Sequence, residues 1–368
     1  MTCAPRILIM AGGTGGHVFP ALAVAQVLES RGWLVDWVGT TRGLESRVVP
    51  AHGFTLHTLP VQGLRGKGVL FRVRSVLRLL ASLIQSLGLV VKIKPQAVLG
   101  FGGYVSGPAG VAAFLLRSPL VLHEQNAVAG TTNRWLAPLA KRVLLGFPGA
   151  FGIGAEYRLT GNPVRSDISA QRDLKDDIPN TFCLERPLRL LVIGGSLGSA
   201  PLNAGVPDAL AKLTALELVQ LQIRHQCGDQ HVEATQKQYG LGSNRSIEVT
   251  AFIDDMAAAY RWADLVVCRS GALTVSELMA TGTASILVPL PYAIDDHQTQ
   301  NAKILSDAGA GFLLRQDASL ASNLSALLQE LMTTPQRLKT MREKAIALAM
   351  PNAAIAVADT VKEVSLAH

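Results

Sequence analysis

Short apolar runs of strand length alternate along this chain with longer stretches in which apolar residues recur at helical spacing. Near the start, Ile7–Met10 has strand length and Pro20–Leu28 has the helical pattern, with a glycine-rich segment between them. Later runs of strand length are Leu34–Val38, Ala97–Leu99, Leu120–Leu122, Val143–Leu145, Ile247–Thr250, Leu265–Val267 and Ile286–Val288. This alternation predicts an α/β protein whose parallel sheets carry helices on both faces.

The opening strand–glycine–helix pattern occurs a second time, in RLLVIGGSLGSAPLNAGVPDAL at 189–210. The glycines of the two copies correspond at a constant offset of 182 positions: Gly12 with Gly194, Gly13 with Gly195 and Gly16 with Gly198. Two similarly built domains explain this repeat, and the Gly-Asn-Pro turn at 161–163 marks the boundary between them. Ligands of such domains bind outside the carboxyl ends of the strands, so we expect a cleft there.

Composition excludes several classes of protein. With 368 residues, of which 49% are apolar and 17% charged, the chain can bury a large core, and extensive disorder is not expected. No apolar run reaches the roughly 18 residues of a transmembrane helix, and no signal peptide is visible. The four cysteines form no cluster, which is typical of a reducing compartment; they are Cys3, Cys183, Cys227 and Cys268.

The net charge of +7 is concentrated in the first half of the chain. Between Glu45 and Glu124 there is no Asp or Glu, and the stretch contains nine basic residues: Arg47, Arg65, Lys67, Arg72, Arg74, Arg78, Lys92, Lys94 and Arg117. Such a field attracts nucleic acid, anionic lipid or phosphorylated substrates. No nucleic-acid-binding module accompanies the charge, so nucleic acid is not expected as a partner.

The run VLFRVRSVLRLLASLIQSLGLVV at 69–91 predicts a helix. On a helical wheel, one arc collects Phe71, Arg74, Ser75, Arg78, Ser82 and Gln85. An aromatic residue among basic ones is typical of a helix that touches lipid head groups. A core helix with a solvated basic face fits this stretch equally well.

Glycine-rich turns before helices can bind anions, because backbone N–H groups and the helix dipole converge there. The first turn could also serve only to relieve backbone strain. Near 270, Gly271 opens a predicted helix whose first amides could hold a diphosphate, and Glu277 could accept hydrogen bonds from both hydroxyls of a ribose. The helix dipole alone would also favour a glutamate near the N-terminus of this helix, without any ligand. The chain has no Asp-x-Asp motif, so no metal site is expected.

Four motifs follow one another along the chain: HEQNA at 123–127, GNPVR at 161–165, SGALTVSE at 270–277 and HQTQNA at 297–302. As a set in this order they are highly specific, and they resemble the MurG-type glycosyltransferases of bacterial peptidoglycan synthesis. The resemblance implies a GT-B fold of two Rossmann-like domains, and transfer of N-acetylglucosamine (GlcNAc) from UDP-GlcNAc to lipid I, without cofactor or metal. It implies an acceptor- and membrane-binding domain over 1–162, a donor-binding domain over 163–350, and a helix within 351–368 that returns to the first domain. It also places the protein at the cytoplasmic face of the inner membrane, bound peripherally to anionic lipid.

The resemblance assigns site residues position by position. For UDP-GlcNAc these are Thr14, Gly15, Gly16, Asn126, Arg165, Ser196, Ile253, Ala272, Leu273, Thr274, Val275, Ser276, Glu277 and Gln298. For the acceptor they are Gly12, Gly13, Gly102, Gly103 and Tyr104. One position departs from the family pattern, because Leu197 stands where its second glycine loop usually has Gln. Backbone contacts to phosphate would survive this change.

The family inverts the anomeric centre, so a general base must take the proton of the acceptor hydroxyl. The candidates are His17 and Glu124, with Asn126 and Asn203 orienting substrates. His17 could instead cap its helix or bind phosphate, and Glu124 could instead orient a neighbouring group.

Two other functions remain open from the residues alone. An NAD-dependent oxidoreductase would use Gly13, Gly15 and Asp36, but Val18 occupies the third glycine position of the dinucleotide fingerprint. A membrane-surface scaffold would need only the basic helix. The second glycine loop, which has no equivalent acid, also disfavours the oxidoreductase, and the dense polar set at the predicted strand ends disfavours the scaffold.

Overall fold

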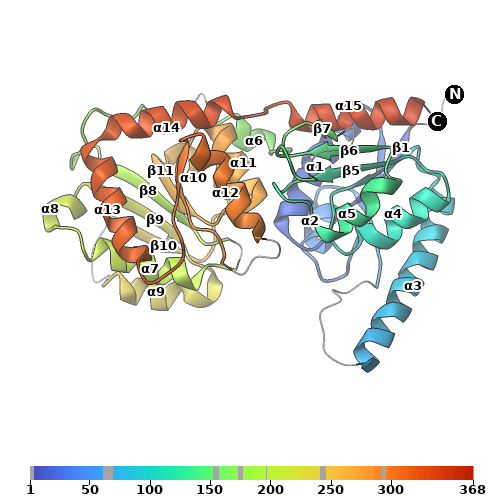
Figure 1. Cartoon of the computed structure of the whole chain (residues 1–368), viewed down its shortest axis with the longest axis horizontal. Coiled ribbons are helices and arrows are strands. Elements are labelled where there is room, and N and C mark those ends of the chain that lie inside the picture. Colours follow the sequence, from blue (N-terminus) through green and yellow to red (C-terminus); the bar gives the residue numbers. More distant parts are fainter. Residues whose placement is uncertain are drawn as a thin grey trace. The chain divides into compact units, whose positions relative to one another are not determined.

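A computed structural model describes residues 4–60, 69–151, 157–172, 177–195, 197–240, 246–291 and 296–367, with the backbone alone over 69–76 (Figure 1). The chain divides into two compact units. Unit 1 comprises 1–165 and 350–368, and unit 2 comprises 166–349.

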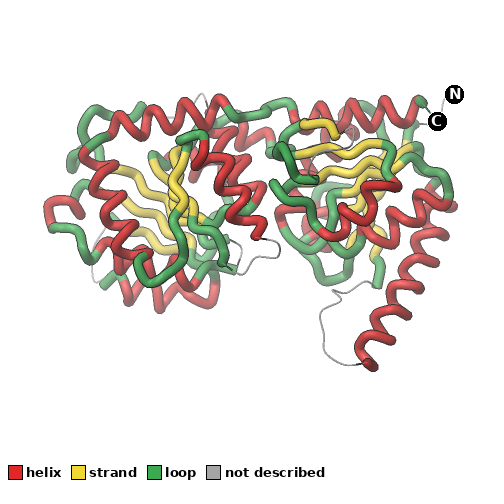
Figure 2. The backbone as a smooth tube through the Cα atoms, in the orientation of Figure 1, coloured by secondary structure: helices red, strands yellow, loops and turns green. Residues whose placement is uncertain are grey.

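Unit 1 is built on a seven-stranded parallel sheet in the order β3-β2-β1-β4-β5-β6-β7 (Figure 2). Its strands are β1 Arg6–Met10, β2 Leu34–Gly39, β3 Thr55–Thr58, β4 Ala97–Gly100, β5 Leu120–Glu124, β6 Arg142–Leu145 and β7 Tyr157–Leu159. Its helices are α1 Gly15–Ser30, α2 Glu45–Ala51, α3 Val69–Ile93, α4 Ser106–Leu115, α5 Thr131–Leu136, the 3-10 helix η1 Ala137–Leu139, and α15 Ala353–Leu366.

Side chains alternate across the central strand β1, so each face of the sheet has its own core. Ile7 and Ile9 pack with buried residues of α1 and α15, whereas Leu8 and Met10 pack on the opposite face with residues of α3 and α4. The last helix, α15, contacts α1 and β4, so the chain end returns to the unit in which it began.

Unit 2 has a six-stranded parallel sheet in the order β10-β9-β8-β11-β12-β13. Its strands are β8 Leu188–Ile193, β9 Leu221–Gln226, β10 Ile247–Thr250, β11 Leu265–Cys268, β12 Ala284–Leu287 and β13 Gly311–Leu313. Its helices are α6 Ser166–Ser169, α7 Ala200–Leu210, α8 Ala215–Leu218, η3 Asp229–His231, α9 Val232–Gln238, α10 Met256–Trp262, α11 Ala272–Thr281, α12 His297–Asp307, α13 Leu320–Thr333 and α14 Pro335–Ala347.

The predicted α/β class is confirmed, and each strand-length run of the sequence overlaps a strand, with only Val288 lying beyond its strand, β12. Four strands had no such signal: β3, β7, β9 and β13. Three of these lie at the edges of the sheets, and β9 alternates polar with apolar residues. Among the described helices, none is long and apolar enough to cross a membrane.

One expectation for α3 is wrong. Ser82 was expected on the solvated basic arc, but it is fully buried, as is Ser86. Their hydroxyls donate to carbonyls one turn earlier, at 2.7 Å each, and their small side chains suit the close packing of α3 on α4. Arg78 and Gln85 of that arc are exposed, but the outward face also presents apolar side chains: Leu80 is 52% and Ile84 69% exposed.

Candidate functional site

In unit 1, the loops that follow β1 and β4 lie against each other at the carboxyl end of the sheet. A Cβ at Gly103 would lie 2.8 Å from the carbonyl oxygen of Gly12, and Ser106 Oγ donates to the carbonyls of both Met10 and Gly102, at 3.2 and 2.6 Å. Gly102 and Gly103 have left-handed backbones, with φ of 89° and 82°. The structure therefore brings the predicted acceptor glycines together.

We call residues 11–16 the first glycine loop. It ends where α1 begins at Gly15, and the first amides of a helix have no acceptor within it. The amide of Gly13, in contrast, donates to Glu45 Oε2 at 2.9 Å. The amides of this loop that suit an anion are therefore those of Gly15 and Gly16, beside the partly exposed His17 and the exposed Thr14.

His17 lies in the first turn of α1, with Nδ1 3.4 Å from Thr14 Oγ1. A Cβ on Gly102 would lie 3.5 Å from its Nε2, so the ring faces the second loop of the acceptor glycines. Burial lowers the pKa of His17 below its usual 6.5, although the carboxylates of Glu124 and Glu45 oppose this. A neutral imidazole is the form that can accept a proton.

Glu124 ends β5 and is 2% exposed. Its Oε1 accepts from the backbone N–H and the side-chain amide of Asn126, at 2.9 and 3.1 Å. Its Oε2 accepts from the Gly130 amide and from Asn133 Nδ2, both at 2.9 Å. Four donors occupy the four lone-pair positions of a carboxylate. This arrangement favours the alternative role of orienting the loop and Asn126 over that of the base.

Arg165 closes the GNPVR motif in unit 1, and its guanidinium lies 5.5 Å from the ring centroid of Phe19 on α1. Nearby, His123 is fully buried and its Nε2 lies 2.9 Å from the carbonyl of Gly161. Burial lowers the pKa of His123 to about 4. It is therefore neutral at neutral pH and forms part of the support for the motif's backbone.

In unit 2, we call residues 194–199 the second glycine loop. Gln226 supports it: Oε1 accepts from the Gly194 amide at 3.2 Å, and Nε2 donates to the carbonyls of Gly195 and Ala251 at 2.9 and 3.0 Å. A Cβ on Gly198 would overlap the carbonyl of Cys227. The predicted donor residue Ser196 lies outside the described residues. The departing residue Leu197 is 87% exposed.

Asn203 was expected to orient substrate, yet it is only 5% exposed. Its Nδ2 donates to the Cys227 carbonyl at 2.9 Å, and its Oδ1 lies 3.1 Å from His225 Nε2. Tyr239 closes this network, with its hydroxyl 2.7 Å from His225 Nδ1. Burial lowers the pKa of His225 to about 4. In this state, Asn203 holds the backbone under the second glycine loop.

The helix α11 begins after Gly271, as predicted. Of its first residues, Leu273 and Thr274 are partly exposed, whereas Ala272, Val275 and Ser276 are buried. The side chain of Val275 belongs to the core, so any contact it makes with a ligand comes from its backbone. Glu277 is 8% exposed, and its Oε2 accepts from the hydroxyl of Tyr260 at 2.9 Å. Tyr260 thus orients the carboxylate predicted to bind ribose.

Arg269, which the sequence analysis did not single out, connects the second glycine loop with the segments that follow β12 and β13. Its guanidinium donates to Ser199 Oγ at 3.0 Å, to the Val288 carbonyl at 3.0 Å, and to Gln316 Oε1 at 2.6 Å. The predicted Gln298 is held nearby, with Oε1 accepting from the Leu290 amide at 2.9 Å. The available signal was the position of Arg269 directly before the SGALTVSE motif.

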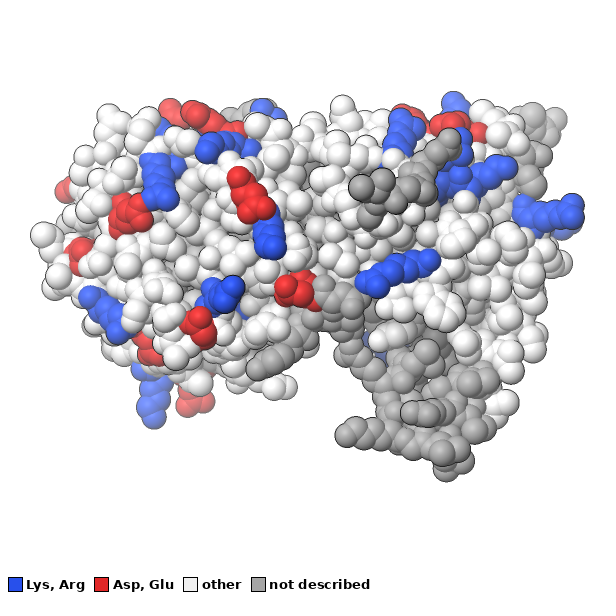
Figure 3. Space-filling model, in the orientation of Figure 1, with Lys and Arg blue, Asp and Glu red and all other residues white. Residues whose placement is uncertain are grey.

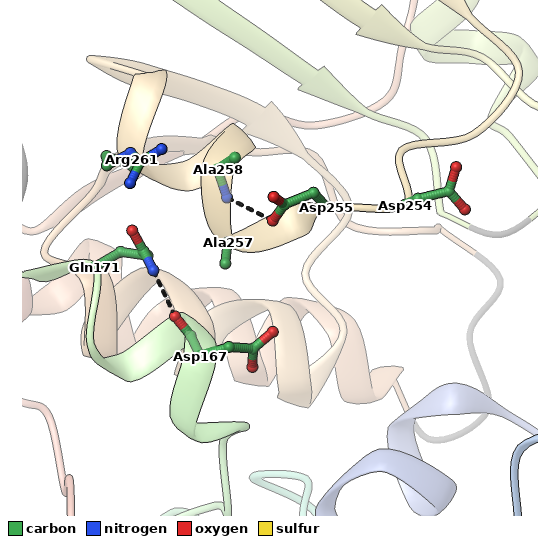
Figure 4. A pocket seen from close by; sticks show the side chains of 7 residues that line it. All are labelled: Asp167, Gln171, Asp254, Asp255, Ala257, Ala258 and Arg261. Atoms are coloured by element: carbon green, nitrogen blue, oxygen red, sulfur yellow. Dashed lines mark hydrogen bonds between the residues drawn. The ribbon is translucent and has the colours of Figure 1, made fainter. Parts of the chain in front are cut away.

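A pocket of about 490 Å³ is lined in part by Asp254 and Asp255, which directly follow the predicted donor residue Ile253 in sequence (Figure 4). Its lining is Asp167, Gln171, Asp254, Asp255, Ala257, Ala258 and Arg261. Asp255 caps α10 by accepting from the Ala258 amide at 2.8 Å, and Asp254 points away from the other labelled side chains. The acidic lining disfavours a diphosphate. Among the described residues, no group of three potential ligands could hold a metal ion.

Charge is distributed differently over the two units. On the visible face of unit 2, acidic and basic side chains are interspersed (Figure 3). The described acid-free stretch between Glu45 and Glu124 leaves basic side chains such as Arg78, Lys92 and Arg117 without acidic neighbours in sequence. The positive field expected from the sequence therefore belongs to unit 1.

Two family descriptions match this architecture. The glycosyltransferase family 28 N-terminal domain matches residues 7–145, and the glycosyltransferase family 28 C-terminal domain matches residues 189–357. This chain belongs to glycosyltransferase family 28. The resemblance to MurG-type glycosyltransferases is thereby confirmed, and an oxidoreductase is not supported.

Curated relatives within the family match over nearly their whole length. The UDP-N-acetylglucosamine--N-acetylmuramyl-(pentapeptide) pyrophosphoryl-undecaprenol N-acetylglucosamine transferase of Stutzerimonas stutzeri (strain A1501) is 51% identical over 98% of this chain and 99% of its own. The enzyme of that name from Pseudomonas aeruginosa (strain LESB58) is 50% identical, with the same coverage.

Solved structures agree on the fold. The crystal structure of Acinetobacter baumannii MurG has a TM-score of 0.79 and 41% identity, covering 98% of this chain and 99% of its own. A kitacinnamycin glycosyltransferase has a TM-score of 0.70 at 18% identity, covering 99% of this chain and 100% of its own. The predicted GT-B fold class is confirmed by these matches.

Proposed function

We propose that this protein transfers GlcNAc from UDP-GlcNAc to the 4-hydroxyl of MurNAc in lipid I, forming lipid II for peptidoglycan synthesis. The observation that carries the proposal is the 51% identity, over 98% of the chain, to a relative named for this transfer. The strand-end loops described above supply the required chemical groups in both units.

The donor is assigned mainly to unit 2. The unpaired first amides of α11 suit a diphosphate, and Glu277, oriented by Tyr260, suits the two ribose hydroxyls. Ile253 and Gln298 complete the nucleotide and sugar contacts in this proposal. The remaining donor positions of the family pattern are Thr14, Gly15, Gly16, Asn126, Arg165 and Ser196, of which we assign Thr14, Gly15 and Gly16 to the GlcNAc part of the donor and not to UDP.

The reaction is a single displacement at the anomeric carbon. The acceptor 4-oxygen forms a bond to C1 of GlcNAc while the bond from C1 to the β-phosphate oxygen breaks, and UDP leaves with the electron pair. We assign the proton of the 4-hydroxyl to the neutral imidazole of His17. Glu124 keeps Asn126 and its loop in place, and Arg165 with the dipole of α11 stabilises the departing UDP.

The test of the proposal is a transfer assay with UDP-GlcNAc and a soluble lipid I analogue, run with and without EDTA. Glu277→Ala removes the ribose contact and should raise the KM for UDP-GlcNAc by about tenfold or more. Glu233→Ala, at an exposed glutamate of α9 in the same unit, is the matched control and should transfer at the normal rate. Absence of transfer by the unchanged protein would refute the proposal.

We also propose that unit 1 docks on the anionic cytoplasmic face of the membrane through α3 and the end of α4. Exposed apolar side chains there include Leu77, Leu80, Ile84, Val91, Phe114 and Leu115, and basic residues accompany them. This combination suits an anionic lipid surface. Replacing Leu80 and Ile84 by Ser should weaken binding to phosphatidylglycerol vesicles, whereas Leu216→Ser, at an exposed leucine of unit 2, should not.

A further inference from the structure

Glu45 is a fully buried acidic residue at the start of α2 that the proposed transfer does not use. Its Oε2 accepts from the Gly13 amide at 2.9 Å. Its Oε1 accepts from both the amide and the hydroxyl of Thr40, at 2.8 Å each. All three partners are donors, as an ionised carboxylate requires.

Three glycines make room for this carboxylate. A Cβ on Gly12 would lie 2.7 Å from Glu45 Oε1, and one on Gly39 would lie 2.5 Å from its Cγ. A Cβ on Gly43 would overlap the carboxylate itself. The end of β1, the end of β2 and the turn before α2 therefore close around a single side chain. Any larger residue at these positions would displace the carboxylate or the loop.

A buried negative charge here has a cost for the proposed reaction. It lies directly behind the first glycine loop, where it repels an anionic substrate. It also occupies the amide of Gly13, which is then not available to a phosphate. Gly13 has a φ of 93°, and glycine adopts positive and negative φ about equally readily, so the hydrogen bond from Glu45 selects one of several accessible orientations of this peptide.

We propose that Glu45 is a positioning residue that fixes the first glycine loop so that the amides of Gly15 and Gly16 and the ring of His17 face the substrate. This inference rests on the proposed function of that loop. Glu45 touches neither substrate nor reacting atoms in this role. It acts through the backbone of Gly13.

The charge of Glu45 has a second consequence, which a merely structural residue would not have. Its carboxylate raises the pKa of His17 and so opposes the lowering by burial. Removing the charge should therefore lower the pKa of His17 further. The acid limb of the pH profile of kcat/KM should then move to lower pH.

The experiment compares Glu45→Gln with Glu29→Gln, a matched change at an exposed glutamate of α1, in the full-length protein. We expect Glu45→Gln to lower kcat/KM with the lipid I analogue by about tenfold or more, to shift the acid limb to lower pH, and to speed hydrogen exchange in the peptide 7–17. Binding of UDP should stay unchanged, and Glu29→Gln should change none of these.

Normal kcat/KM and an unmoved acid limb in a folded Glu45→Gln protein would overturn the inference. If that variant fails to fold, Thr40→Val removes one donor to the carboxylate and should give a smaller change in the same direction; no change would likewise overturn it. If the unchanged protein transfers no GlcNAc, the proposed function fails. The exchange of peptide 7–17 then still decides whether Glu45 holds the loop.

Discussion

The two glycine loops have similar sequences and the same place at the end of a central strand, yet their supports differ in charge. Behind the first loop lies the carboxylate of Glu45, bound to the Gly13 amide. Behind the second lies the neutral amide of Gln226, bound to Gly194 and Gly195. A neutral support imposes no repulsion on a diphosphate. This difference supports the proposed division, in which the nucleotide binds to unit 2, at α11 and the second glycine loop, and proton transfer takes place at the first glycine loop.

The largest expected effect comes from removing the proposed base. His17→Ala should lower kcat by about 10²- to 10⁴-fold, the usual contribution of a general base, because no other neutral acceptor of a proton is assigned beside the first loop. Binding of UDP should be unaffected, since the nucleotide is assigned to unit 2. His52→Ala, at an exposed histidine of the same unit, is the control. A large loss of UDP affinity in His17→Ala would contradict the division of roles.

The two units share a buried neutral histidine, and the pH dependence of the free energy of unfolding tests this common feature. Each contains a buried histidine, His123 or His225, whose pKa burial lowers to about 4. In the unfolded chain each of these histidines binds a proton near pH 6.5, whereas in the folded chain it does so only near pH 4. Stability should therefore fall as the pH drops from about 6.5 to about 4, by up to roughly 3 kcal/mol for each histidine. Urea unfolding at several pH values measures this, and a flat profile over that range would contradict it.

The smallest expected effect comes from removing the support of the second glycine loop. Gln226→Leu removes three hydrogen bonds under that loop and should weaken UDP binding by about tenfold. Gln222→Leu, on the same strand and partly exposed, should leave binding unchanged. Calorimetric titration with UDP distinguishes the two. Equal affinities in both variants would mean that the loop holds its shape without Gln226.

The sequence predicted the fold well because its strongest signals are local. The buried strands β1, β4, β5, β11 and β12 are short apolar runs, and a run of this kind indicates a strand without tertiary context. The edge strand β3 has one apolar residue, Leu56, and the edge strand β13 is only three residues long, so their pairing defines them. The prediction for Ser82 of α3 was wrong because a serine whose hydroxyl donates to a carbonyl of its own helix can face the core.

The candidate site could be predicted in outline but not in its supports. The glycines of the two glycine loops, His17 and Glu277 were recognisable from motifs because they belong to contiguous segments. Glu45, Gln226 and Arg269 act across loops that are far apart in sequence, and nothing in the spacing of these residues indicates which amide each will bind. Glu45 had a weak signal, since two glycines, Gly39 and Gly43, shortly precede it.

The most direct test of this account is a paired measurement of the Kd for UDP in Glu45→Gln and Gln226→Leu. We expect Gln226→Leu to weaken UDP binding about tenfold, and Glu45→Gln to bind UDP like the unchanged protein and to lose only transfer. Equal loss of UDP affinity in both variants would contradict the account, because the two glycine loops would then share one role.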